Sequence, residues 1–353
     1  MHRDRFRYLV LLTFVLALGV IALGAYTRLT EAGLGCPDWP GCYGFAGVPQ
    51  TAVQQAEAAA RFPDAPLEHH KAWNEMLHRY VAGALGLLIL LINILAWRRP
   101  AHPLPPRPKL LPALLLVVVI FQAALGMWTV TLSLMPVVVM GHLLGGFTTA
   151  ALLFALCLSV FSSANQVHVS SAAGYVPTTR QVGKGLSLLA GFGLVTVIGQ
   201  IALGGWTAAN YAALVCTQLP ICEVDWQQQF DPSAFSLIQP VHDTYQYGVL
   251  DFAQRVSIHV SHRLGAMITS VILLLLAWRA WRVPALRRAT AGMLLLLSVQ
   301  VALGITNVVA SLPLTIAVAH NVTGVLLLLS VVALNVQIYR QRQGARGWRP
   351  ARA

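Results

Sequence analysis

Charged side chains are scarce in this sequence, and acidic ones are the scarcest. Only 10% of its 353 residues are charged, and just 12 residues are Asp or Glu. Hydrophobic residues make up 57% of the chain, and the mean hydropathy is +0.66. A water-soluble fold cannot bury that much apolar surface, so the sequence predicts a polytopic membrane protein.

Apolar runs long enough to cross a bilayer recur along the chain. A transmembrane helix needs about 20 mostly apolar residues to span a hydrocarbon core of about 30 Å. Eight such helices are predicted, near residues 8–27, 77–97, 110–130, 137–160, 186–206, 256–278, 289–309 and 314–338. The first follows the basic segment MHRDRFR, as a signal peptide would. Its closing IALGAYT returns as IALGGWT at 201–207, which favours a retained helix.

Basic and acidic residues segregate between alternate loops. Basic residues gather in the amino terminus, the 98–109 loop, Arg180 with Lys184, the 279–288 loop and the tail from Arg340. Every acid except Asp4 lies in 28–76 or 207–255. The positive-inside rule then puts both termini in the cytoplasm and those two long loops outside it. The net charge of +12 is thus assigned to membrane topology, and no nucleic-acid partner is expected.

The chain also contains an internal duplication. Ordered matches pair Ile21–Gly24 with Ile201–Gly204, Cys36 with Cys216, Cys42 with Cys222, His78-Arg79 with His262-Arg263, Gln122 with Gln300, and His142 with His320. Four helices separate equivalent positions, so both halves have the same orientation in the membrane. The predicted fold is all-α: eight transmembrane helices form two pseudo-symmetric four-helix bundles. The expected parts are an amino-terminal bundle (1–160), a cytoplasmic linker (161–185) and a carboxy-terminal bundle (186–353).

Cysteine is rare, but four of the five cysteines form two C-x5-C pairs in the outer loops. These pairs are Cys36 with Cys42 and Cys216 with Cys222. Outside the cytoplasm, structural disulfides are favoured, and a redox-active thiol relay is the alternative. Neither loop offers a Cys/His quartet of the zinc type. Cys157 is expected to be a buried, inert thiol.

Four of the eleven histidines recur in register: His78, His142, His262 and His320. Each is expected in the first turn or two of a helix that starts at the outer face. An ionisable residue within a membrane span is costly without a partner. Two histidines on facing helices of a bundle suit a planar metal macrocycle, and their recurrence favours bis-histidine haem ligation over interfacial histidines bonded to water.

Residues beside these histidines add two further candidates to each half. Arg79 and Arg263 can pair with haem propionates or anchor their helices at the interface. Glu75 lies three residues before His78, on the same helical face, whereas His259 takes that place in the second half.

This asymmetry favours an enzyme with one specialised half. A carboxylate beside a bound macrocycle can move protons or stabilise developing positive charge. The alternative is that Glu75 only pairs with Arg79 or Arg28, or caps its helix. Arg28 also lacks a basic counterpart, because Ala208 stands at the equivalent position.

The motifs TRLTEAGLGCPDWPGC (27–42), EMLHR (75–79), the second HR (262–263) and the paired C-x5-C loops resemble the haem A synthase family. These membrane enzymes oxidise the ring methyl of haem O to a formyl group through an alcohol stage, and the product serves terminal oxidases.

The resemblance implies a role for each candidate residue. Haem b is the expected cofactor in the carboxy-terminal bundle, with His262 and His320 on its iron and Arg263 beside it. Haem O is the expected substrate in the amino-terminal bundle, near His78, His142, Arg79 and Arg28. Glu75 is the expected catalytic residue. The cysteine pairs resemble those of bacterial forms, which implies the bacterial inner membrane.

Two functions of other classes remain open: a bis-histidine b-type cytochrome for electron transfer, and a haem transporter. An electron carrier should place its histidine pairs near opposite membrane faces, whereas all four histidines are predicted near one face. Transporters commonly have inverted halves, whereas these halves are predicted to have the same orientation. The expected partners are haem O and the lipid bilayer. Haem O synthase, terminal oxidase assembly factors and a second copy of the chain are further candidates.

Overall fold

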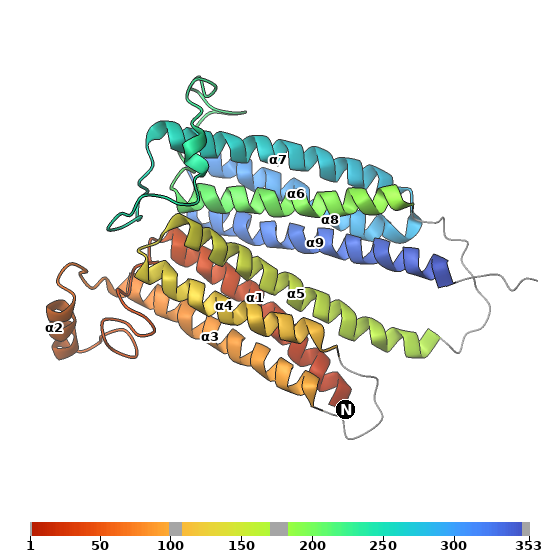
Figure 1. Cartoon of the computed structure of the whole chain (residues 1–353), viewed down its shortest axis with the longest axis horizontal. Coiled ribbons are helices and arrows are strands. Elements are labelled where there is room, and N and C mark those ends of the chain that lie inside the picture. Colours follow the sequence, from red (N-terminus) through yellow and green to blue (C-terminus); the bar gives the residue numbers. More distant parts are fainter. Residues whose placement is uncertain (1, 99–107, 170–182, 348–353) are drawn as a thin grey trace, which may run out of the picture.

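The computed structural model is all-α and describes residues 2–98, 108–169 and 183–347 (Figure 1). Eight of its helices are long and apolar enough to cross a membrane, which confirms the predicted number. They are α1 (His2–Leu29), α3 (His69–Trp97), α4 (Leu110–Thr131), α5 (Pro136–Val169), α6 (Lys184–Ala209), α7 (Phe252–Trp281), α8 (Arg287–Val309) and α9 (Leu314–Gly347).

These helices form two groups of four that lie side by side (Figure 1). In the first group, α1 and α4 each pack against both α3 and α5; in the second, α6 and α8 each pack against both α7 and α9. The groups meet where α1 packs on α9 and α5 packs on α6. Each half therefore repeats the same set of neighbours, and a symmetry axis relating the halves stays a prediction.

The predicted domain boundaries fall near the ends of α5 and α6. Residues 161–169 of the predicted linker continue α5, and Lys184 begins α6. The part between them, 170–182, lies outside the described residues.

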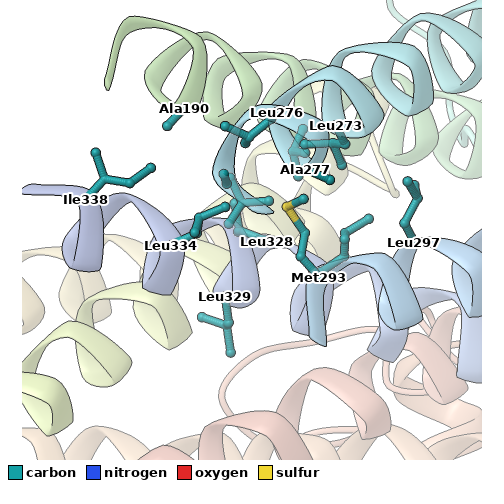
Figure 2. Close-up of a cluster of buried hydrophobic side chains, with 14 of the residues drawn as sticks. Ala190, Leu273, Leu276, Ala277, Met293, Leu297, Leu328, Leu329, Leu334 and Ile338 are labelled. Carbon is teal, nitrogen blue, oxygen red and sulfur yellow. The ribbon is translucent and has the colours of Figure 1, made fainter. Parts of the chain in front are cut away.

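Apolar packing joins the two groups. The largest buried cluster draws on α6, α7, α8 and α9 and also includes Phe147 and Ala150 of α5. Figure 2 shows Leu276 of α7, Met293 of α8 and Leu328 of α9 within it. In a bilayer, helices associate through such close packing rather than through exclusion of water. The contacts hold the helices that carry the histidines in fixed relative positions.

The two long loops, 30–68 and 210–251, lie at the same end of the helices, opposite the amino terminus (Figure 1). The first contains α2 (Ala52–Arg61), a short helix that the sequence reading missed. Its signal was a capping box, in which Thr51 and Gln54 bond each other's backbone amides. The second contains a 3-10 helix, η1 (Pro232–Phe235), and another such turn, η2 (Pro284–Leu286), precedes α8.

Two of the helices that begin earlier than predicted, α3 and α7, carry histidines in register. α3 starts at His69 rather than near 77, and α7 starts at Phe252, where Asp251 and Gln254 form a capping box. His78 and His262 therefore lie more than two turns into their helices, and the expectation of the first turn or two is wrong for them. The polar first turns of α3 and α7 extend past the apolar stretch, which hydropathy alone cannot detect.

Candidate functional site

The four histidines in register lie on two pairs of facing helices. His78 on α3 faces His142 on α5, and His262 on α7 faces His320 on α9. In each half the two helices of a pair occupy opposite corners of the bundle, because both pack against the remaining two helices. The partners lie close enough to act on each other electrostatically. The structure therefore brings together both predicted pairs.

Each histidine ring packs against a glycine on a neighbouring helix. A Cβ atom added to Gly24 would lie 3.0 Å from the ring of His78, and one added to Gly204 would lie 3.0 Å from that of His262. A Cβ atom added to Gly126 would lie 3.4 Å from the ring of His142, and one added to Gly304 would lie 3.2 Å from that of His320. The missing side chains let the rings approach the helix backbone. The tripeptide ALG stands at each of these contacts, at 22–24, 124–126, 202–204 and 302–304, but it also occurs at 17–19 and 84–86, where the glycine meets no histidine, so it was only a partial signal.

The donor set fits an iron macrocycle. Within the described residues, Nδ1 of His78, His142 and His320 is buried and has no hydrogen-bond partner. A buried polar atom without a partner is costly, and imidazole nitrogen is a common axial ligand of haem iron. Two facing imidazoles per bundle are the arrangement that bis-histidine ligation requires.

Glu75 links the histidine-bearing helix α3 to the first disulfide loop. Its side chain is buried, and Oε1 lies 2.5 Å from Nη2 of Arg79. Its other oxygen, Oε2, accepts a hydrogen bond of 2.9 Å from the backbone N–H of Cys36. Pairing with Arg79 was one alternative that the sequence left open, and the structure contains that pair. Two donors orient the carboxylate one turn before His78.

Arg79 and Arg263 each hold a disulfide loop by its carbonyl groups. Arg79 donates through Nη1 to the carbonyl oxygens of Asp38, at 2.9 Å, and Gly41. Arg263 donates to the carbonyl oxygens at the same places in the second loop, those of Gln218, at 2.6 Å, and Ile221. Both guanidinium groups thus serve the loops, and the predicted pairing with haem propionates stays a prediction.

His259 occupies the place of Glu75 in the second half. It is 4% exposed, and Nε of Arg263 donates to its Nε2 at 3.1 Å. Arg263 also donates to the carbonyl oxygen of Cys216 at 2.6 Å. The second half therefore carries no carboxylate at this point.

Arg28 ties the first half to the second. Its Nη2 donates to the carbonyl oxygen of Ala208 at 2.8 Å, and its guanidinium lies 4.1 Å from the ring centre of Tyr211. Its Nε is buried without a hydrogen-bond partner in the described part of the chain. The predicted contact of Arg28 with the substrate haem stays a prediction.

Both predicted cysteine pairs form disulfides, Cys36–Cys42 and Cys216–Cys222. Glu223 lies beside the second, but both sulfurs are consumed by their bond, so this group is a poor metal site. Hydrogen bonds from its own backbone N–H and those of Thr217 and Gln218 lower the pKa of Glu223 to about 2. Cys157 is a free, buried thiol, as predicted.

The fold and the facing histidines define an all-α membrane protein with a pair of facing imidazoles in each four-helix bundle, an arrangement that suits a flat metal macrocycle. Residues 7–332 match the model of the COX15-CtaA family, described as cytochrome oxidase assembly protein. The chain belongs to this family of haem A synthases.

Curated relatives agree over nearly the full length. A protein of Shewanella oneidensis named "Heme A synthase" is 47% identical over 95% of this chain and 97% of its own length. Proteins of the same name from Mesorhizobium japonicum and Paracoccus denitrificans are each 28% identical, over 89% and 98% of this chain and 84% and 88% of their own lengths.

Proposed function

We propose that this protein is a haem A synthase that oxidises the ring methyl of haem O to a formyl group by way of an alcohol. The observation that carries the proposal is the asymmetry between two matching histidine sites. Both have facing imidazoles, but only the first has a buried carboxylate, Glu75, next to it. The membership of the haem A synthase family supports the same reaction.

The two halves take different haems in this proposal. Haem O binds as substrate between α3 and α5, where His78 and His142 face each other. Haem b is the resident cofactor between α7 and α9, with His262 and His320 as its axial ligands. When bound, haem b supplies one-electron redox chemistry. The facing imidazoles support both assignments, and in three of the four rings, those of His78, His142 and His320, Nδ1 is buried without a partner in the described residues.

Glu75 acts on the substrate side. Oxidation of the alcohol to the aldehyde passes two electrons to an acceptor and releases two protons, and a base beside the reacting carbon can take up one of these protons. The carboxylate is oriented by Cys36 N–H and by Arg79, which leaves little freedom of the side chain to be lost in the transition state. It can receive a proton or stabilise positive charge at the substrate carbon.

Arg79 and Arg28 hold the protein segments that surround the proposed substrate site. Arg79 holds the 36–42 loop at the outer end of the bundle, and Arg28 holds the first half against the second. A propionate of haem O would share Arg79 with loop carbonyls and could use the unpaired Nε of Arg28. Arg263 plays the corresponding loop-holding role beside haem b.

The distribution of charged residues supports a membrane location and an orientation for the protein. The protein lies in the bacterial inner membrane with both termini in the cytoplasm and both disulfide loops outside. Haem O is too apolar to travel freely in water, so direct transfer from haem O synthase is the proposed supply route. Assembly factors of terminal oxidases are the proposed recipients of the product.

The test uses purified full-length protein from cells that make haem O and lack any other haem A synthase. Haems extracted with acidified solvent are identified by chromatography and mass. We expect haem b together with haem A or its alcohol precursor. Haem b alone, with haem O accumulating unchanged in the cells, would instead indicate an electron carrier or a transporter.

A further inference from the structure

We propose that Gln200 is a positioning residue for His262 and that it makes the carboxy-terminal half retain its haem. This inference rests on the proposed function, because it takes the second half as the cofactor half. Nε2 of Gln200 on α6 lies 2.9 Å from Nδ1 of His262 and donates to the carbonyl oxygen of the same residue at 2.9 Å. Among the four histidines in register, His262 alone has a buried Nδ1 with a partner in the described residues.

The contact depends on a glycine. A Cβ atom added to Gly265, about one turn beyond His262, would lie 2.4 Å from Oε1 of Gln200. Any larger residue at 265 would push the amide out of its place. Gln200, His262 and Gly265 therefore form one unit across the α6–α7 contact.

The first half lacks both supporting members of this unit. The segment GVIALG at 19–24 matches GQIALG at 199–204, so Val20 stands where Gln200 stands. The HRYV of the first half matches the HRLG of the second, so Val81 replaces Gly265. Nδ1 of His78 is correspondingly buried without a partner in the described residues. The equivalent residues Gln122 and Gln300 serve the other histidine of each pair: Nε2 of Gln300 lies 3.2 Å from Nε2 of His320, and neither glutamine is bonded to His78 or His262 in the described residues.

A hydrogen bond to one imidazole nitrogen fixes the tautomer and the ring plane presented by the other. The amide of Gln200 can serve Nδ1 in either tautomer, because its nitrogen donates to a bare Nδ1 and its oxygen accepts from Nδ1–H. Oε1 is buried with no other partner in the described residues. His262 is thus oriented before haem arrives, and an ordered ligand loses less freedom on binding.

This difference matches the roles of the two halves. A resident cofactor has to stay through many turnovers, whereas substrate has to enter and product has to leave. The ring of His78, with valine at both supporting positions, carries no such restraint. The pair Gln200 and Gly265 marks the half that keeps its haem.

The test compares Gln200→Val, Gln200→Glu and the wild type as full-length protein in detergent. One measurement is the rate at which haem b passes to an excess of a haem-scavenging apoglobin. We expect Gln200→Val to lose haem b roughly 10–100-fold faster, the usual cost of removing a hydrogen bond to a metal ligand. Thr196→Val is the matched control, because its hydroxyl bonds only Gly193 of the same helix.

The second measurement is the midpoint potential of haem b. Gln200→Glu keeps an acceptor for Nδ1–H and adds negative charge, so it should retain haem and shift the potential downward. A residue that merely fills space would not produce that shift. Haem loss and potential equal to wild type in both variants would overturn the role of Gln200. If Gln200→Val does not fold, Gln200→Glu with an unchanged potential still overturns it.

The outcome can be separated from failure of the proposed function. Wild-type protein that binds haem b but makes no haem A would refute the function and leave the Gln200 measurements interpretable. Normal haem A formation with unchanged haem loss in Gln200→Val would refute only the role of Gln200.

Discussion

Arg79 and Arg263 occupy equivalent positions in the two halves and make the same kind of contact. Each sits one residue after a histidine in register and donates to carbonyl oxygens of its own disulfide loop, 36–42 or 216–222. The duplicated frame of helix, loop and arginine is therefore common to both halves. Differences in chemistry have to come from side chains that differ between the halves on this shared frame.

One such difference lies four residues before each arginine. Arg79 pairs with the buried Glu75, while Arg263 donates to the buried His259. The first arrangement keeps a carboxylate beside the histidine, and the second keeps an imidazole. In the proposed function, this substitution is one of those that distinguish the half that acts on substrate from the half that holds the cofactor.

The largest expected effect comes from removing the carboxylate. Glu75→Gln keeps the size of the side chain but loses its basicity, so haem A formation should fall by roughly 10²–10⁴-fold, the usual contribution of an acid–base group. Haem b content should stay at the wild-type level. Turnover is measured by chromatography of extracted haems, with His259→Gln as the counterpart in the other half. Equal losses in both variants, or normal turnover in Glu75→Gln, would contradict the specialisation.

The second prediction concerns which pair holds the cofactor. His320→Ala removes one imidazole from α9 and should abolish the low-spin bis-histidine spectrum of haem b. His142→Ala, the matching change on α5, should leave that spectrum intact and weaken haem O binding. Optical and electron paramagnetic resonance spectra of the purified variants check both. A lost spectrum in His142→Ala would reverse the assignment of the halves.

The third prediction compares the two arginines by stability. Arg79→Gln leaves Glu75 buried without its cation, which typically costs about 3–5 kcal/mol. Arg263→Gln leaves only His259 and carbonyl groups without a donor, at about 1–3 kcal/mol. Thermal unfolding in detergent should therefore show the larger drop for Arg79→Gln. Similar drops for the two would mean that the loop carbonyls, rather than the ion pair, dominate.

Much of this comparison was readable in the sequence. The apolar runs predicted eight helices, and the ordered matches of His78 with His262 and His142 with His320 predicted the facing pairs. The C-x5-C spacing predicted both disulfides. These features succeed because each depends on residue type and spacing alone.

Other features depend on where loops fold back. The bond from Cys36 N–H to Glu75 joins residues far apart in sequence, and no periodicity predicts it. Gln200 occupies the one position at which the repeated segments GVIALG (19–24) and GQIALG (199–204) differ. Its contact with His262 on α7 is visible only in three dimensions. The early start of α3 was missed because its first turns are polar.

A smaller effect is expected at the glycines under the rings. Gly204→Ala places a methyl group 3.0 Å from His262, so the ring has to shift and haem b should be lost several-fold faster. Gly199→Ala on the same helix meets nothing within 4 Å and serves as the control. The apoglobin transfer rate measures both. Identical rates would show that the ring has room to move without cost.

The smallest expected effect concerns the second disulfide loop. The pKa of Glu223 is lowered to about 2 from an ordinary 4.5 by hydrogen bonds from backbone N–H groups. The largest contribution comes from the backbone N–H of Glu223 itself. A lowered pKa in the folded state means that its contribution to stability is fully present above pH 4.5 and is lost as pH falls toward about 2. The loop should therefore loosen across that window, and a phosphine reductant should cleave Cys216–Cys222 faster, relative to its rate on a free disulfide at each pH.

Glu223→Gln separates this titration from general acid unfolding. The amide cannot accept the same set of bonds from Thr217 and Gln218 as strongly, so the loop should already react faster at pH 7. Between pH 4.5 and 2 its relative rate should then change less than that of the wild type. If both proteins show the same acid profile, the loop is held by the Arg263 contacts that it shares with its counterpart, and Glu223 adds nothing to them.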